Sequence, residues 1–220
     1  MTAGNRSRSS DTKRRLLDAA EQLFAERGFK RTSISALARK ARVNQAAVNY
    51  HFGSKAALVE QVIERRSSTI GCLRMERLQA VRERAARTGI PPDIDALLDA
   101  FVAPAFLLID GEKRGKYFML LANRAFSEPD ETIQNIFVNE FAPSFRLFIE
   151  LMRAALPDLS ETELHWRLQF VIGAMAHAMH VCGGQLPESD IFPAAENPDR
   201  LLKRLLAFLA AGLRAPVAAS

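Results

Sequence analysis

The segment from residue 32 to residue 55, TSISALARKARVNQAAVNYHFGSK, constrains the fold most, because its apolar residues recur at helical spacing on either side of a short break. Ile34, Leu37 and Ala41 give a first short helix an apolar face, and Val48 and Phe52 give one to a second helix. Two short helices that bury such faces across a tight turn form a helix-turn-helix. The pattern therefore predicts a DNA-reading module, although ordinary helical hairpins have the same spacing.

Capping side chains mark the helix boundaries in this segment. Thr32 and Ser33 precede the first helix, Asn44 precedes the second, and Ser54 precedes a third. A Ser, Thr or Asn oxygen at such a position accepts a hydrogen bond from a backbone amide that the helix start leaves free. The helix starts are therefore predicted by capping as well as by periodicity.

The second helix, residues 45–52, leaves a face that suits DNA. Amide side chains read adenine in the major groove, small side chains contact thymine methyls, and polar side chains at the rim bind phosphates without reading sequence. We expect base contacts from Gln45, Ala46, Ala47 and Asn49, and phosphate contacts from Thr32, Tyr50, His51 and Lys55.

Positive charge is concentrated at the N-terminal end. Residues 1–66 hold 14 Lys and Arg against 6 Asp and Glu, whereas residues 67–220 hold 16 against 19. A basic domain beside a mildly acidic one is typical of binding to phosphates, although any one charged cluster can be a solvated face. We expect residues 1–10 to form a disordered basic arm, which either enters a minor groove or stays inert.

One more helix completes the predicted DNA-binding domain, residues 11–55. Asp11 or Thr12 can cap its start, Leu16 and Phe24 belong to its buried stripe, and Gly28 can end it in a left-handed conformation. The domain is thus predicted to be a three-helix unit.

These residues resemble the DNA-binding domain of TetR-family regulators over residues 11 to about 60. The similarity rests on LLDAAEQLFAERGF at 16–29, TSI at 32–34 and NYHFGSKAAL at 49–58. Two positions depart from the usual pattern: Arg42 replaces a turn glycine, and Asn49 stands where an aromatic residue is frequent. A left-handed Arg costs on the order of 1 kcal/mol, and Asn49 suggests an altered base preference.

The remaining apolar runs also repeat at helical spacing, so we predict an all-α protein of about nine helices. Further helices are expected at 55–87, 93–109, 113–127, 130–156, 160–183 and 198–213. They would form a ligand-binding and dimerisation domain over residues 56–214, followed by a flexible tail over residues 215–220.

The sequence also predicts where the protein resides. No apolar run is long enough to span a membrane, and the N-terminus has no apolar signal core, so we expect a cytoplasmic protein without a membrane partner. Cys72 and Cys182 lack the spacing of a zinc module or a disulfide framework, and we expect both to be reduced, with Cys182 buried.

Two predicted helices have the composition of a dimer surface. Residues 168–179, LQFVIGAMAHAM, are apolar nearly all round and rich in small residues, and residues 201–209 are similar. Such a helix suits a position between its own core and a partner, although central core helices of a monomer also have this composition. We expect a homodimer with a four-helix bundle, whose two heads read an inverted repeat. The predicted interface residues are Phe170, Gly173, Ala174, His177, Leu202, Leu205 and Leu209.

The C-terminal domain is rich in Phe and Met, which suits an apolar ligand cavity or, equally well by periodicity, a plain core. The predicted pocket residues are Phe101, Phe118, Leu121, Arg124, Phe137, Phe141, Phe145 and Met175. Arg124 interrupts an apolar helix, where its guanidinium could meet a carboxylate or thioester, although Arg residues are more often surface or salt-bridge residues.

Three scattered segments resemble the PsrA-type branch of the TetR family: YFMLLANRAFS at 117–127, LHWRLQFVIGA at 164–174 and FLAAGLR at 208–214. This resemblance implies a response to long-chain fatty acids. We therefore predict a repressor that a fatty acid or acyl-CoA releases from its operator. Another hydrophobic compound, such as an aromatic or a drug, is the alternative effector.

An enzyme and an interaction adaptor are the competing classes. His177 and His180 lie three residues apart near Cys182, an arrangement that can bind a metal. No carboxylate accompanies them between residues 173 and 184, and phosphate loops, GxSxG turns and paired Cys motifs are absent. We expect no enzyme, metal or cofactor. A helical adaptor would differ by showing no salt-dependent DNA binding.

Overall fold

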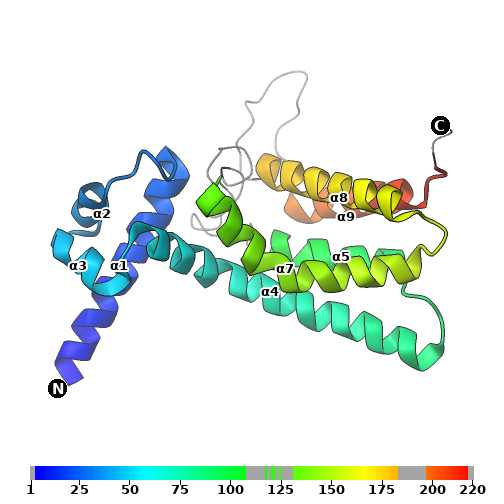
Figure 1. Cartoon of the computed structure of the whole chain (residues 1–220), viewed down its shortest axis with the longest axis horizontal. Helices are drawn as coiled ribbons and strands as arrows, with labels where there is room; N and C mark the ends of the chain where they lie inside the picture. Colours follow the sequence, from blue (N-terminus) through cyan, green and yellow to red (C-terminus); the bar gives the residue numbers. More distant parts are fainter. Residues whose placement is uncertain are drawn as a thin grey trace. The chain divides into compact units, whose positions relative to one another are not determined.

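The computed structural model describes residues 3–107, 117, 120, 121, 124, 131–182 and 197–217. Within these residues lie eight helices and no strand (Figure 1). The helices are α1 (Ala3–Arg27), α2 (Ile34–Ala41), α3 (Gln45–Phe52), α4 (Lys55–Thr88), α5 (Ile94–Phe106), α7 (Glu131–Ala155), α8 (Glu161–Cys182) and α9 (Pro198–Arg214). The all-α prediction is confirmed, and the expected bounds from α4 onward agree to within a few residues. Tyr117, Leu120, Leu121 and Arg124 are helical, but the rest of the helix expected over 113–127 lies outside the described residues.

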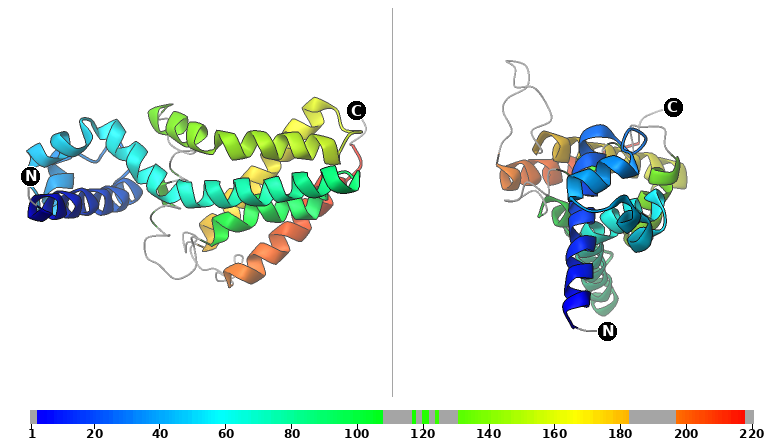
Figure 2. Two further views of the ribbon diagram at one scale, coloured as in Figure 1. Left: turned by 90° about the horizontal axis from the view of Figure 1, so that it is seen from below. Right: turned by 90° about the vertical axis from the view of Figure 1, so that its left-hand side faces the viewer.

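The chain divides into two compact units. The first comprises Met1–Ser68 and Lys113–Glu140, and the second comprises Thr69–Glu112 and Phe141–Ser220. Helix α4 runs unbroken from one unit into the other (Figure 2). The division inside α4 falls at Ser68, later than the boundary at residue 55 drawn from the sequence, because residues such as Leu58 and Val62 are buried in the first unit.

Helices α1, α2 and α3 pack together in the first unit, as the sequence predicts. Leu16 and Phe24 of α1, Leu37 of α2, and Val48 and Phe52 of α3 are buried. Each such side chain contributes about 1.5–3 kcal/mol on burial. The apolar faces of the two short helices therefore hold α3 with its opposite face outward.

Helix α1 begins earlier than predicted. It starts at Ala3, so residues 3–10 do not form the expected disordered arm. Starting a helix is costly, but a helix that the core already anchors gains one backbone hydrogen bond for each further residue that it orders. Asp11 pairs with Arg14 inside the helix at 2.6 Å, and the Thr12 hydroxyl donates to the Arg8 carbonyl at 2.9 Å. Neither residue caps the start of α1.

The other predicted boundaries of the first unit are confirmed. Ser33 before α2, Asn44 before α3 and Ser54 before α4 each accept a backbone N–H at 3.0–3.2 Å. Gly28 follows α1 with φ +81° and donates its amide to the Phe24 carbonyl at 2.9 Å. These local bonds fix where each helix begins and ends.

The turn between α2 and α3 keeps its geometry without a glycine. Arg42 adopts φ 54° and ψ 48°, and it is the one non-glycine residue of the described part with a positive φ. The Arg15 guanidinium donates to the carbonyls of Ala41 and Arg42. These bonds offset the roughly 1 kcal/mol that a left-handed L-residue costs.

In the second unit, α9 packs against both α5 and α8. The buried guanidinium of Arg167 on α8 donates to the carbonyls of Leu213 and Ala215 at 2.8 and 2.7 Å, and to Glu163 at 2.7 Å. It therefore satisfies carbonyls that the end of α9 leaves free.

Residues 215–217 are not helical, and residues 218–220 of the expected tail lie outside the described residues. No described helix is both long and apolar enough to cross a membrane.

Candidate functional site

Helix α3 presents most of the predicted base-reading residues to solvent. Gln45, Ala46 and Asn49 are exposed, and Ala47 is half-buried. Because the inward face is held by the buried Val48 and Phe52, the outward face keeps a fixed orientation in the first unit. The exposed face is about two turns long, which is enough to place three or four side chains on base edges.

The end of α3 and the start of α4 carry the predicted rim residues. Tyr50 is 82% exposed, and its ring meets that of the half-buried His51 edge-on, with centroids 5.1 Å apart. The Lys55 ammonium lies 4.2 Å from the centroid of the Phe29 ring. This contact fixes the position of a positive charge beside the recognition helix.

The phosphate contact expected of Thr32 is not supported. Its side chain is buried, and its hydroxyl donates to the carbonyls of Gly28 at 2.8 Å and Leu23 at 3.2 Å. The hydroxyl satisfies carbonyls at the end of α1, while the neighbouring Ser33 caps α2. Thr32 therefore has a structural role in joining the two helices.

A buried cluster of charges joins α1 to the start of α4. Glu21 is 2% exposed and pairs with Arg65 and, at 3.0 Å, with Arg66; Arg65 also pairs with Asp18 at 2.8 Å. The cluster holds the helix that follows α3 against α1. This cluster was not predicted, although a Glu directly after Ala20 within a buried stripe signals a partner, because carboxylates are almost never fully buried unpaired.

The predicted dimer residues fall into two groups. Phe170 is 67% exposed, and Gly173 and His177 are exposed on the same helix, α8. Ala174 and Leu202 are half-buried. Leu205 and Leu209 are buried inside their own unit, so these two residues belong to the core of the protomer and not to an outer face.

Two more aromatic residues on the helices expected to form the dimer surface are exposed, although neither was among the predicted interface residues. Trp166 lies one turn before Phe170 on α8 with ring centroids 6.4 Å apart, and Phe208 on α9 is 70% exposed. Figures 1 and 2 show α8 beside α9. Trp166, Phe170 and Phe208, three exposed aromatic residues of α8 and α9, are called the exposed aromatic surface, because exposed apolar patches mark interaction sites.

The predicted pocket residues are divided between the two units. Phe101, Phe141, Phe145 and Met175 belong to the second unit, whereas Leu121, Arg124 and Phe137 belong to the first. Phe118 lies outside the described residues. In the second unit, the Phe101 ring stacks on Phe148 with centroids 4.2 Å apart and meets Phe145 edge-on at 5.5 Å.

Arg124 does not have the ligand-binding role proposed from the sequence. Its Nε donates to the Ala25 carbonyl at 2.7 Å, and its Nη2 donates to the Glu26 carbonyl at 3.1 Å. Both acceptors lie at the C-terminal end of α1, where carbonyls have no partner within the helix and a positive charge is favourable. Arg124 therefore caps α1.

A different arginine is buried among the second unit's aromatic residues. Arg74 of α4 is 4% exposed, and its Nε donates to the Phe101 carbonyl at 2.7 Å. Arg74 was not among the site residues predicted from the sequence. Its position between Ile70 and Leu78, at a spacing of four residues in a buried stripe, is the signal that would have found it.

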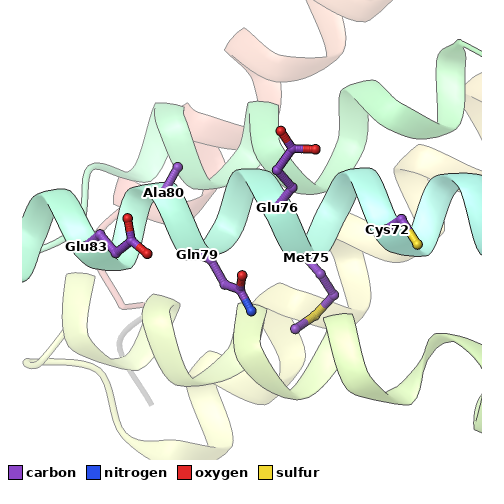
Figure 3. Close-up of a pocket in the computed structure, with 6 residues that line it drawn as sticks. All are labelled: Cys72, Met75, Glu76, Gln79, Ala80 and Glu83. Carbon is purple, nitrogen blue, oxygen red and sulfur yellow. The ribbon is translucent and has the colours of Figure 1, made fainter.

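An open groove of about 480 Å³ runs along another face of α4 (Figure 3). It is lined by Cys72, Met75, Glu76, Gln79, Ala80 and Glu83. At 3.6 residues per turn, these positions lie opposite Arg74 on the helix. Because two carboxylates line the groove, it does not suit an apolar or acidic effector.

The histidines of α8 do not form a metal site in the described part of the chain, which holds no group of three His, Cys, Asp or Glu suited to a metal. Burial, with His177 nearby, lowers the pKa of His180. Burial also raises the pKa of the half-buried Cys182 thiol. Both shifts favour the neutral forms.

Comparison with known families identifies the chain. Residues 99–212 match the family described as "Tetracyclin repressor-like, C-terminal domain", and residues 16–62 match "Bacterial regulatory proteins, tetR family". The chain belongs to the TetR family. The family that the N-terminal match describes is one of bacterial regulatory proteins.

Individual relatives match only part of the chain. The A-factor receptor protein of Streptomyces griseus is 34% identical over 64 residues, which are 29% of this chain and 23% of that protein. AcrR of Shigella flexneri is 32% identical over 76 residues, 34% of this chain and 35% of the relative. The chain thus spans less than half the length of the curated relatives it matches.

Solved structures share the fold over most of the chain. The match to a putative transcriptional regulator from Pseudomonas aeruginosa PAO1 covers 92% of this chain and 92% of that structure, with a TM-score of 0.62 and 16% sequence identity. The match to Salmonella enterica GusR covers 93% of this chain and 96% of GusR, with a TM-score of 0.58 and 17% sequence identity. At these identities the likenesses show a shared fold.

Proposed function

We propose that this TetR-family protein is a homodimeric repressor that binds an inverted repeat in double-stranded DNA and is released by a small hydrophobic effector. The observation that carries the proposal is the outward face of α3, which is exposed and polar while its inward face is buried. A protein with this partner acts in the cytoplasm.

The proposed DNA contacts follow from the geometry of α3. Gln45 and Asn49 carry amides that can bond adenine in the major groove, and Ala46 and Ala47 can contact thymine methyls. Tyr50, His51 and Lys55 lie at the rim, where they can bind phosphates. The excess of positive charge in residues 1–66 favours the same surface for DNA.

The proposed dimer uses the exposed aromatic surface of α8 and α9. A two-fold axis pairs the same surface on two protomers, so aromatic and small side chains can meet in a four-helix bundle. Phe170, Gly173 and His177 keep their proposed roles, and Phe208 takes the place of Leu205 and Leu209 on α9.

The proposed effector is a fatty acid or acyl-CoA. Support comes from the resemblance to the PsrA-type branch and from the cluster of Phe and Met side chains in the second unit. Flexible Met and flat aromatic side chains adapt to a long alkyl chain. An aromatic compound or a drug remains the alternative within the same function.

Helix α4 offers a route from effector to DNA. It begins at Lys55, three residues after α3 ends, and continues to Thr88 in the second unit. An effector that binds the DNA-incompetent state more tightly would shift α4 and change the separation of the two recognition helices. The helices would then no longer fit successive major grooves.

Fluorescence anisotropy tests this function. We expect tight binding to DNA from immediately upstream of the protein's own gene, weakening by orders of magnitude between about 50 and 200 mM salt. Fatty acids and acyl-CoAs of graded chain length should release the DNA, with one length class most effective. Salt-insensitive or absent DNA binding would instead favour an adaptor, and indifference to every acyl compound would exclude this effector class.

Substitutions on α3 should separate base reading from phosphate binding. Gln45→Ala and Asn49→Ala are expected to relax preference at a base position at a cost of about 1–3 kcal/mol, because each removes an amide that pairs with a base edge. Tyr50→Phe should weaken binding to all DNA sequences alike. Binding to a panel of single-base operator variants checks this, and uniform losses from all three substitutions would contradict the base-reading roles.

A further inference from the structure

Arg74 is a charged side chain inside an apolar, aromatic part of the second unit. It lies on the buried face of α4, and its guanidinium carbon is 4.1 Å from the Phe101 ring centroid and 5.5 Å from that of Phe141. Burial lowers its pKa to about 10, so the group keeps its charge at neutral pH. The second unit therefore contains a buried cation.

The partners of this cation carry no compensating charge. Nε donates to the Phe101 carbonyl at 2.7 Å, and Nη2 makes a long contact of 3.7 Å to the Met175 sulfur. Among the described residues, no carboxylate lies within salt-bridge distance of Arg74, and no acceptor lies within hydrogen-bond distance of its Nη1. The other buried arginine of the second unit, Arg167, has the carboxylate of Glu163.

A buried charge without a counter-charge is costly, and a carboxylate can satisfy a guanidinium with two parallel hydrogen bonds. Aromatic rings and a thioether on the other sides suit a hydrocarbon chain. We propose that Arg74 binds the carboxylate of the effector, and that the effector is an alkyl chain with a free acid at its end. This inference rests on the proposed ligand-responsive function and names the chemistry of its ligand.

The geometry favours a free acid over a thioester or an alcohol. A carboxylate is planar and negative, as the two amino groups of a guanidinium require, whereas a thioester presents one neutral oxygen. The contact from Nη2 to the Met175 sulfur is weak, and a Met side chain has several accessible rotamers. Met175 can therefore move aside for a carboxylate while the Phe101 carbonyl keeps its bond to Nε.

Calorimetric titration of the full-length protein with dodecanoate and with 1-dodecanol tests the proposal. The wild type should bind the acid at least about tenfold more tightly than the alcohol, because a hydrogen-bonded ion pair is lost with the alcohol. Arg74→Met should remove this preference and leave binding of the alcohol unchanged. Arg77→Met, one turn from Arg74 in an exposed pair with Asp99, is the matched control and should keep the preference.

The thermal stability of the variants separates a binding role from a structural one. Arg74→Met removes an uncompensated buried charge, so its Tm should equal or exceed that of the wild type. Equal affinities for acid and alcohol in the wild type, no binding of the acid, or a preserved preference in Arg74→Met would overturn the proposal. Operator binding, measured with the same ligands, distinguishes failure of the proposed function from failure of the role of Arg74. DNA release by the alcohol alone would sustain the proposed function and overturn the role of Arg74.

Discussion

Replacing Phe170 and Phe208 together with Glu is expected to convert the dimer into monomers and to lower affinity for a full inverted-repeat operator by about 100-fold or more. Both rings are largely exposed in the protomer, so the substitutions disturb little of its own core. In the proposed dimer the same positions meet around a two-fold axis, where four carboxylates would be desolvated close to one another. Operator affinity falls because a monomer bound at one half-site no longer keeps a second DNA-binding domain close to the other half-site.

Light scattering during size-exclusion chromatography gives the oligomeric state, and anisotropy with full and half operators gives the affinity. Val138→Glu is the matched control, because Val138 is a large, exposed apolar residue of α7 that lies outside α8 and α9. It should leave both readouts unchanged. A double variant that remains dimeric with wild-type operator affinity would show that the exposed aromatic surface serves another partner.

The parts of the fold that the sequence predicted are those fixed by local interactions. Ser33, Asn44 and Ser54 act on backbone amides two or three residues away, so their effect is visible in the sequence. The inward positions of α3 follow in the same way from periodicity. Helix α1 is the exception, because its extension to Ala3 depends on anchoring by a core that lies well beyond those residues.

Roles that depend on a distant partner were not predictable. Thr32 and Arg124 carry groups that suit phosphate and carboxylate, but both donate to carbonyls of α1 that only the fold brings near. On α9, Arg200, Lys203 and Arg204 are exposed while Leu205 and Leu209 are buried, so the helix has one apolar face, and the exposed Phe208 lies outside it. For Arg74, the spacing from Ile70 and Leu78 signals burial, but its partners, such as the Phe101 carbonyl, become known only from the fold.

The buried charge cluster of the first unit carries the second large expected effect. Glu21→Gln should lower the free energy of unfolding by about 3 kcal/mol or more, because Arg65 and Arg66 would lose a buried counter-charge. Arg65 would keep its 2.8 Å pair with Asp18, but its Nε already has no hydrogen-bond partner in the described structure, and Glu21 is also the carboxylate that pairs with Arg66. Urea denaturation followed by circular dichroism measures the change.

Two further variants separate loss of the buried charge from loss of the side chain. Glu26→Gln changes an exposed carboxylate on the same helix and should alter stability by less than about 0.5 kcal/mol. Glu21→Leu combined with Arg65→Met and Arg66→Met removes both signs of charge and should recover most of the lost stability. If Glu21→Gln changes stability by less than about 1 kcal/mol, the pairs are solvated like surface ion pairs. Glu21→Gln leaves the exposed face of α3 unchanged. We therefore expect its DNA binding to fall only in proportion to the fraction of protein that remains folded.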